Sequence, residues 1–332
     1  MQGWRTEMED AHIANIELDE QKSALFGVYD GHGGKEVAKF VSRHLAEELV
    51  RLPAYHENKQ GDALQLSYLR IDDMLWKEEN RQELMELATP ERGEPSSGPR
   101  ARGIFEDESM KRRLKVAVRA RARMNGSLNT PYEQEFGGPT TKHDDASEPL
   151  SPGTTAGCTA VTAFVRGDQL VVANSGDSRG VLCRGGRSIA LSKDHKPTDE
   201  PENRRITRAG GYVVDGRING SLNLSRAIGD LEYKESRHLP PQEQIVTAWP
   251  EVKHVKLEKG DDFMILACDG IWDVLSNQAA CDFVKRNLVK TPRPSLSKIA
   301  SDMCDHCLAK DTNNKGLGCD NMSVVIVRFK KL

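Results

Sequence analysis

The sequence has no long hydrophobic run and no large excess of charge of one sign. Its longest apolar stretches, such as Phe263 to Cys268 and Val324 to Val327, fall far short of the roughly 20 residues that a membrane-spanning helix needs. The 332 residues contain 47 Lys and Arg against 50 Asp and Glu, a formal charge of −3. These absences predict a soluble protein without a membrane span, and the charge balance argues against a direct nucleic-acid role.

Cysteine does not follow the pattern of a disulfide scaffold. The seven cysteines are odd in number and scattered along the chain. The amino-terminal residues also lack the pattern of a secretory signal. We therefore expect free thiols and an intracellular location, in the cytoplasm, the nucleus or both.

Several well-known catalytic motifs are missing. The sequence has no Walker loop, no dinucleotide-binding glycine fingerprint in a strand-to-helix setting, and no His-Glu-x-x-His zinc helix. No cysteine precedes an arginine at the spacing of a thiol phosphatase loop. Cys304-Asp305-His306-Cys307 has a ligand-like spacing, but no second thiol pair accompanies it, which favours a structural interpretation over a zinc site.

The patterning predicts both strands and helices. Apolar, β-branched runs predict strands at Ala24 to Asp30, Thr159 to Val165, Gln169 to Asn174, Arg179 to Cys183, Asp262 to Cys268 and Met322 to Phe329. Helical spacing predicts helices at Gly34 to Leu52, Asp62 to Leu87, Asp199 to Ala209, Asn277 to Leu288 and Ser295 to Ala309. The Arg166-Gly167-Asp168 turn predicts a hairpin. We expect an α+β fold with mainly antiparallel sheets and helices packed outside them.

One segment lacks this patterning. Between about Thr89 and Pro152, Pro, Gly, Ser and charged residues dominate, which predicts a flexible insertion in a single domain that spans 1–332. The insertion includes the basic cluster Lys111 to Arg123, which is either a solvated segment, a nuclear-import signal or a binding site for an acidic partner.

Acidic residues recur at predicted strand ends and beside glycines. Asp30 ends one buried strand in YDGHGG, and Asp269 follows another in LACDGIWD. The other acidic residues of this kind are Glu9, Asp10, Asp177, Asp273 and Asp320. A carboxylate at the end of a buried strand is unfavourable unless it is paired or metal-bound. If they converge, these side chains form an oxygen-rich site suited to Mg²⁺ or Mn²⁺, which predicts metal-dependent hydrolysis.

The order of these motifs is similar to that of a known family. GWRTEMEDAH, VYDGHGG, GTTAGCTAV, ANSGDSRG, DHKP, RAGGYV, GRINGSLNLSRAIGD, LACDGIWDVL and CDNMSVVIV occur in the order seen in the metal-dependent protein serine/threonine phosphatases of type 2C. The resemblance covers the chain outside Thr89 to Pro152. LPPQEQ and GLGCDNMS look most like the gamma isoform. The resemblance implies a β-sandwich of two mainly antiparallel sheets flanked by helix layers, in the order α-β-β-α.

The resemblance also implies the roles of the acidic residues. Asp30 would bridge two metal ions, with Glu9 and the Gly31 carbonyl on one ion and Asp269 and Asp320 on the other. Asp10 would hold waters from behind the ligands. Asp177, with Asp269 and Asp273, would match a weaker third position. The expected ions are two Mg²⁺ or Mn²⁺ per site.

The implied reaction hydrolyses phosphoserine and phosphothreonine in proteins. A water or hydroxide bridging two divalent ions would attack without a covalent phosphoenzyme. Arg5 would bind the phosphate oxygens, and His32 would protonate the leaving oxygen. Arg204, Arg205 and Arg208 lie in the implied lid, Asn203 to Gly229, and are either substrate contacts or ordinary surface charges.

Two other functions stay open at this point. One is a noncatalytic interaction protein that keeps the phosphatase fold and works through its insertion. The other is a metal-dependent phosphatase of small molecules. The expected partners are phosphoprotein substrates and a protein bound at the insertion, and the expected state is a monomer.

Overall fold

The computed structural model describes residues 1–89, 154–290, 295–312 and 316–329. All of these residues fall in one compact unit made of 1–94 and 152–332. The insertion predicted at about 89–152 lies outside the described residues apart from Thr89, and so does its basic cluster Lys111 to Arg123. Within the described ranges, no helix is both long enough and apolar enough to cross a bilayer.

A five-stranded antiparallel sheet forms the first half of the core. Its strand order is β1-β2-β5-β6-β12, so that β1 and β12 are the edges. The strands are β1 (Ala11–Asn15), β2 (Ala24–Tyr29), β5 (Ala160–Arg166), β6 (Gln169–Ser175) and β12 (Glu251–Lys256). Arg166 pairs with Gln169 across the turn, which confirms the predicted hairpin. The short, polar strands β1 and β12 were missed because neither has a continuous apolar run.

A four-stranded antiparallel sheet packs against the first sheet. Its order is β14-β13-β7-β8, with β7 (Arg179–Arg184), β8 (Arg187–Ala190), β13 (Asp261–Ala267) and β14 (Val324–Arg328). Because side chains alternate along a strand, Met264 and Leu266 pack toward the first sheet, and Phe263 and Ile265 pack toward the helices. The central strand β13 is therefore buried on both faces and reads as a continuous apolar run.

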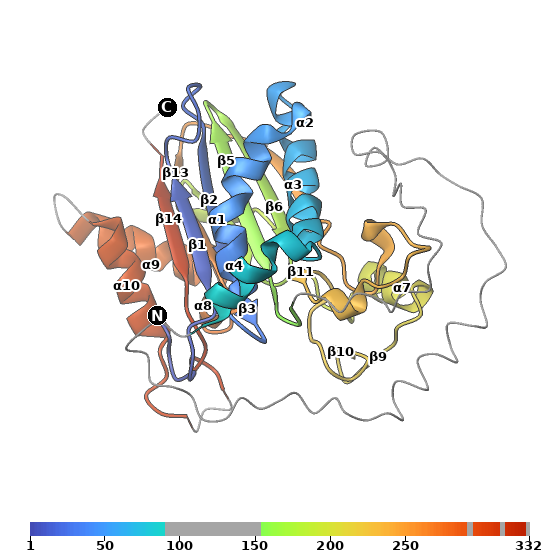
Figure 1. Ribbon diagram of the computed structural model, residues 1–332. Helices are drawn as coiled ribbons and strands as arrows, with labels where there is room; N and C mark the ends of the chain where they lie inside the picture. The colour runs from blue at the N-terminus through green and yellow to red at the C-terminus, as the bar shows by residue number, and fades with distance from the viewer. Residues whose placement is uncertain (90–153, 291–294, 313–315, 330–332) are drawn as a thin grey trace. The chain divides into compact units, whose positions relative to one another are not determined.

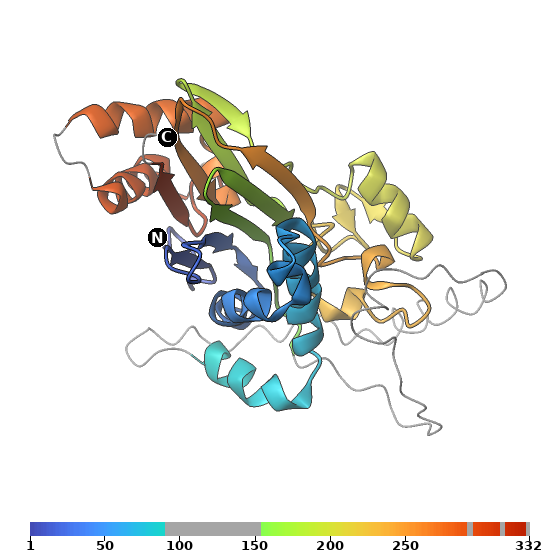
Figure 2. The same cartoon turned by 90° about the horizontal axis from the view of Figure 1, so that it is seen from above.

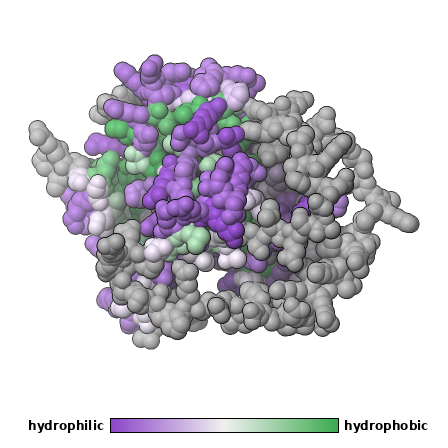
Figure 3. All heavy atoms as spheres, in the orientation of Figure 1, coloured by the Kyte–Doolittle hydropathy of each residue, from purple (hydrophilic) through white to green (hydrophobic). Residues whose placement is uncertain are grey.

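Helices cover both outer faces of the sandwich. Figure 2 shows α1 and α3 (blue) on one side of the sheets and α9 and α10 (orange to red) on the other. These helices are α1 (Glu36–Arg51), α3 (Gln60–Met74), α9 (Asn277–Lys290) and α10 (Leu296–Cys307). Hydrophilic residues gather on the face seen in Figure 3, with apolar residues visible between them. The α-β-β-α arrangement confirms the predicted fold class (Figure 1).

The predicted helix Asp62 to Leu87 is wrong as a single element. The chain forms α2 (Pro53–His56), then α3, and after a break forms α4 (Glu78–Ala88). The Asn80 amide donates to the carbonyl of Met74 at 2.8 Å, which satisfies the end of α3. Apolar periodicity continues across the break, so spacing alone could not reveal it.

A small subdomain lies between β8 and β12 in the chain. It contains α7 (Glu200–Arg208), β9 (Val213–Val214), β10 (Arg217–Ile218) and β11 (Ile228–Gly229), with single 3₁₀ turns at Leu231–Tyr233 and Pro241–Glu243. β11 pairs with β4 (Gly157–Cys158), which pairs with β3 (Gly31–His32). The remaining short helix is α8 (Asp269–Trp272). A separate apolar cluster around Ile206 and Val246 holds the subdomain together.

A buried carboxylate also ties the subdomain together. Glu202 on α7 forms ion pairs with Arg205 and Arg226, both at 2.6 Å, and accepts a hydrogen bond from the Ser225 hydroxyl at 2.9 Å. Burial raises the pKa of Glu202, but the two guanidinium groups outweigh burial and lower the pKa from 4.5 to about 2. Glu202 therefore stabilises the fold mainly in its ionised form.

The Glu202→Gln variant tests this network. A carboxylate with a lowered pKa stabilises the protein above the unfolded-state pKa of 4.5, and this contribution is lost as the pH falls toward 2. The shift corresponds to about 3 kcal/mol at neutral pH. In urea unfolding, the difference between wild type and variant should shrink by about 1.4 kcal/mol from pH 7 to pH 3.5.

The control is Glu200→Gln on the same helix. Glu200 forms an ion pair with Arg204, and both side chains are largely exposed. This variant should change the unfolding free energy by less than about 1 kcal/mol. An equal loss in both variants would contradict the role of the Glu202 network.

Candidate metal centre

The ends of strands from both sheets meet at one rim of the sandwich. Glu9 and Asp10 precede β1, and Asp30 follows β2. Asp177 comes after β6, Asp269 begins α8 just beyond β13, and Asp320 lies before β14. In Figure 1, β3 and α8 lie at the lower end of the sandwich, which is this rim. The topology thus brings together acidic residues that are far apart in the sequence.

Most of the predicted site residues line one pocket of about 210 Å³. The predicted residues in its wall are Arg5, Glu9, Asp30, Gly31, His32, Asp177, Asp269 and Asp320. The wall also contains Thr159, Arg217, Ser221, Leu222, Asn223, Leu224 and Asn321. Asp10 and Asp273 are the predicted acidic residues outside the lining.

Asp10 lies behind the pocket. Its side chain is buried, and among the described residues neither carboxylate oxygen has a partner that meets hydrogen-bond geometry, although Ser323 and Cys268 lie close by. Ligand atoms of Asp10, Asp30 and Cys268 lie within 4.8 Å of one another. Burial, with the nearby Asp10 and Asp30 carboxylates, raises the pKa of Cys268, so this residue is a thiol and the site offers oxygen ligands.

The carboxylates at the rim repel one another. Burial and then the charges of Asp10, Asp269, Asp177 and Asp320 raise the pKa of Asp30. Burial and its acidic neighbours raise the pKa of Asp269 to about 7. Burial likewise raises the pKa of Asp10 to about 6. A group of oxygen ligands with unsatisfied oxygens and mutually raised pKa values fits a hard divalent cation.

Close backbone approaches hold the site in place. A Cβ atom at Gly31 would lie 2.3 Å from the Glu9 carbonyl oxygen, and one at Gly270 would lie 2.1 Å from the Asn321 carbonyl oxygen. The Asn321 carboxamide accepts from the Glu9 N–H and donates to the carbonyls of Gln2 and Glu7. The segment before β1 is thereby fixed to the segment before β14, beside Asp320.

The two predicted catalytic side chains both have acidic partners. Arg5 is 60% exposed on its side chain and donates to Asp320 Oδ2 at 2.7 Å. His32 Nε2 lies 2.8 Å from Asp230 Oδ2 and 2.9 Å from Oδ1. Nδ1 is therefore the ring nitrogen that does not contact Asp230. Burial lowers the pKa of His32, but the Asp230 carboxylate outweighs burial, so the pKa is raised above 6.5.

The predicted third metal position differs from the other two. Asp177 is buried, and its carboxylate forms an ion pair with the Lys196 ammonium. The Asp273 side chain has an exposed surface. Partial loss of solvent around its carboxylate, with the charges of Asp177 and Asp320, raises the pKa of Asp273 despite the nearby Lys196. Any cation at this position competes with Lys196.

The predicted lid arginines divide into two groups. Arg204 and Arg208 are exposed on α7. Arg205 is buried, donates to the carbonyls of Ser225 and Gln244, and pairs with Glu202. The prediction that Arg205 contacts substrate is wrong, because its guanidinium is held inside the subdomain.

Sequence reasoning missed several pocket residues. Arg217, Ser221 and Asn223 line the pocket, and Asp230 holds His32. Asp230 has a left-handed backbone with φ of 50° and is buried. A signal was available in the motif GRINGSLNLSRAIGD, which contains all four residues, but spacing did not show which of them face the cluster.

Comparison with known proteins identifies the family. A family profile described as "Protein phosphatase 2C" matches residues 1–90 and 115–316. The chain is 44% identical over 331 residues to "Probable protein phosphatase 2C 11" of Oryza sativa subsp. japonica, with 100% of this chain and 84% of that protein covered. It is 42% identical over 331 residues to "Probable protein phosphatase 2C 21" of Arabidopsis thaliana, with 100% and 85% covered.

A solved structure supports the fold. The chain matches "Crystal structure of a phosphatase from a pathogenic strain Toxoplasma gondii" with a TM-score of 0.66 and 21% identity, covering 100% of this chain and 91% of that one. These likenesses support the family and do not support the expected gamma isoform. The chain belongs to the protein phosphatase 2C family of metal-dependent protein serine/threonine phosphatases.

Proposed function

We propose that this rim is the active site at which phosphoserine and phosphothreonine residues of proteins are hydrolysed. The observation that carries the proposal is the convergence of Glu9, Asp30, Asp269 and Asp320 on one pocket that also contains Arg5 and His32. The noncatalytic alternative is not favoured, because each predicted ligand position carries an acidic residue or, at Gly31, a backbone carbonyl.

The proposed ligands form two overlapping sets. Asp30, Glu9 and the Gly31 carbonyl would hold one Mg²⁺ or Mn²⁺, and Asp30, Asp269 and Asp320 would hold a second. Asp177 and Asp273 offer a weaker third position, since Lys196 already neutralises Asp177. When bound, the ions supply Lewis-acid stabilisation of the phosphoryl group and acidify water, so that no protein nucleophile is needed.

The remaining steps belong to the side chains. Arg5 is exposed at the pocket mouth, where its planar guanidinium binds phosphate oxygens in exchange for Asp320. Asp230 orients His32 and favours its protonated form, so that Nδ1–H gives a proton to the departing serine or threonine oxygen. Asp10 does not line the pocket. It lies beside Asp30 and orients the ligand side chains.

We also propose that the chain forms one catalytic domain and that the protein is intracellular. One catalytic domain is supported by the single compact unit that holds the described residues from both ends of the chain. An intracellular location is supported by the seven cysteines, all free and six of them buried.

The first experiment compares Asp269→Ala with Asp262→Ala. Both residues lie at β13, but Asp269 is in the pocket and Asp262 is exposed at the opposite end of the strand. With Mn²⁺ and a phosphothreonine peptide, Asp269→Ala should lose on the order of 100-fold or more in kcat/KM, because even residues that only support ligands cost about 10- to 100-fold. Asp262→Ala should match wild type.

Phosphate release in excess chelator gives the background rate of this assay, called the chelated zero. A sugar phosphate serves as the competing substrate and should be hydrolysed far more slowly than the peptide. Faster turnover of the sugar phosphate would favour a small-molecule phosphatase. Folded protein with Mn²⁺ and no phosphate release above the chelated zero would overturn the proposed function.

Metal binding should also be visible without turnover. A cation that binds only the folded protein at 100 times its Kd adds about 2.7 kcal/mol of stability. For a domain of this size, the melting temperature should rise by about 4 to 5 °C when Mn²⁺ replaces chelator. Asp269→Asn should raise the melting temperature in chelator, because a like charge is removed, and should reduce the rise with Mn²⁺. A full rise in this variant would contradict Asp269 as a ligand.

The role of His32 predicts a dependence on the leaving group. His32→Gln should lose about 10²-fold or more in kcat on a phosphothreonine peptide, whose alkoxide needs a proton. On p-nitrophenyl phosphate, whose leaving group departs unprotonated, the loss should be under about 10-fold. Asp230→Asn should show the same selectivity in weaker form. Equal losses on both substrates would count against His32 as the acid.

A further inference from the structure

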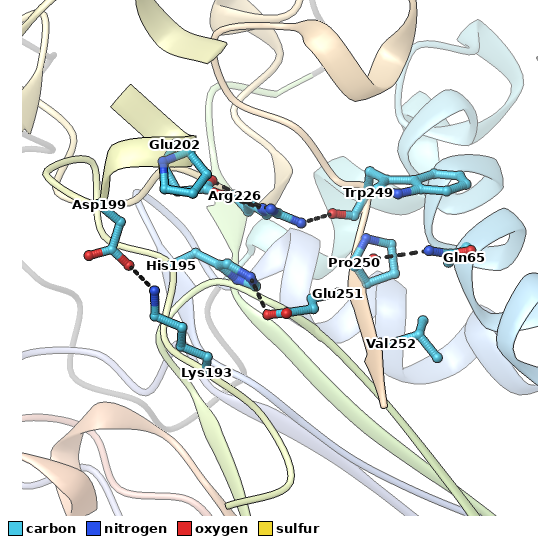
Figure 4. Close-up of a pocket in the computed structure, with 11 residues that line it drawn as sticks. Gln65, Lys193, His195, Asp199, Glu202, Arg226, Trp249, Pro250, Glu251 and Val252 are labelled. Carbon is cyan, nitrogen blue, oxygen red and sulfur yellow. Dashed lines mark hydrogen bonds and ion pairs between the residues drawn. The ribbon is translucent and has the colours of Figure 1, made fainter. Parts of the chain in front are cut away.

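A second pocket, of about 410 Å³, contains none of the predicted site residues. Its wall comes from α3, the start of α7, the loop before α7 and the start of β12 (Figure 4). The charged or titratable residues in the wall are Lys193, His195, Asp199, Glu202, Arg226 and Glu251.

Internal ion pairs neutralise most of these charges. Lys193 pairs with Asp199 at 3.1 Å, and Arg226 pairs with Glu202 at 2.6 Å. Glu251 is different. Its side chain is 57% exposed, and among the described residues its only close ionic neighbour is the His195 ring at 3.4 Å. Figure 4 shows the Glu251 carboxylate pointing toward this ring.

The Gly176 main chain orients the His195 ring. Its Nδ1 accepts a hydrogen bond from the Gly176 N–H at 3.3 Å, so the ring proton is on Nε2. The side chain is only 4% exposed, and its Nε2 faces the Glu251 carboxylate at 3.4 Å. The pocket therefore offers an exposed, ionised carboxylate that, among the described residues, forms no ion pair with a lysine or arginine.

The rest of the wall suits a long basic side chain. Trp249, Pro250 and Val252 supply apolar surface near Glu251. The methylene groups of lysine and arginine pack well on such surface while the charged end reaches a carboxylate.

The pocket lies on the same rim as the metal centre. Strand pairing aligns Asp30 with Thr159 and Ser175 with Ala160, and Glu251 pairs with Asn174 at the start of β12. Three strand spacings of about 4.8 Å, with the offset along β12, put Glu251 roughly 15 Å from Asp30. Residues 221–224 line the first pocket, and Arg226, two residues further, lines the second.

We propose that this second pocket is a substrate subsite in which Glu251 binds a lysine or arginine of the phosphoprotein. At about 3.3 Å per residue, an extended peptide covers the distance in four or five residues, so the basic residue lies four or five positions from the phosphorylated one. This inference rests on the phosphatase activity proposed above.

A set of phosphothreonine peptides tests the inference. Each peptide carries one arginine, at two to eight positions before or after the phosphothreonine, in an otherwise alanine and glycine background. For wild type with Mn²⁺, kcat/KM should be highest at a spacing of four or five on one side, about 5- to 10-fold above the peptide without arginine, mainly through KM. The gain should shrink at high salt, since the contact is partly exposed.

Variants at Glu251 test whether this pocket causes the arginine preference. Glu251→Gln should remove the preference and leave the arginine-free peptide unaffected. Glu251→Lys should transfer the preference to a peptide with glutamate at the same spacing. The control is Glu258→Gln just beyond the other end of β12, where Glu258 is largely exposed and pairs with Arg184. This control should keep the wild-type profile.

The outcomes separate the two proposals. Hydrolysis of all peptides with a flat spacing profile, or a preference that Glu251→Gln leaves intact, would overturn the subsite while the phosphatase activity stands. No hydrolysis of any peptide by the Mn²⁺-supplied protein would overturn the phosphatase proposal and, with it, the subsite.

Discussion

Mutual repulsion among carboxylates at one rim is the constraint on which the rest of the structure depends. Asp10, Asp30, Asp177, Asp269 and Asp320 each follow or precede a strand of the two main sheets, and burial with shared negative charge raises the pKa values of Asp10, Asp30 and Asp269. Such a cluster is stable only where strong packing holds its members together or a cation joins them. The central strands β2 and β13 provide that packing, because their side chains are buried on both faces.

The same constraint explains the local backbone. Gly31 and Gly270 occur where a side chain would collide with the chain segments of Glu9 and Asn321. Asn321 connects the amino-terminal segment to the loop before β14, and the Met322 N–H donates to the Met1 carbonyl at 2.8 Å. The acidic residues from opposite ends of the sequence are therefore held by hydrogen bonds between main chain and carboxamide, independently of any ion.

The sequence predicted the parts of this design that depend on local pattern. The long apolar strands and the acidic residues just after β2 and β13, Asp30 and Asp269, follow from buried runs that end at Gly or Asp. The parts that depend on tertiary packing could not be predicted. Arg204 and Arg205 are adjacent arginines, so the local sequence does not distinguish them. Arg205 is buried because it pairs with Glu202 inside the subdomain, whereas Arg204 pairs with the exposed Glu200. Asp230 contacts His32, which is 198 residues away in the sequence.

One hydrogen-bonded turn at the rim connects the Glu251 pocket with the candidate metal centre. His195 is fixed to Gly176 by two hydrogen bonds, from its own N–H to the Gly176 carbonyl and from the Gly176 N–H to its ring. The next residue, Lys196, pairs with Asp177. The wall of the Glu251 pocket and a carboxylate of the metal centre are thus parts of one hydrogen-bonded turn. Because strand pairing fixes the distance between the two pockets, the spacing of the substrate groups they bind follows from the sheet itself and not from the closure of a lid.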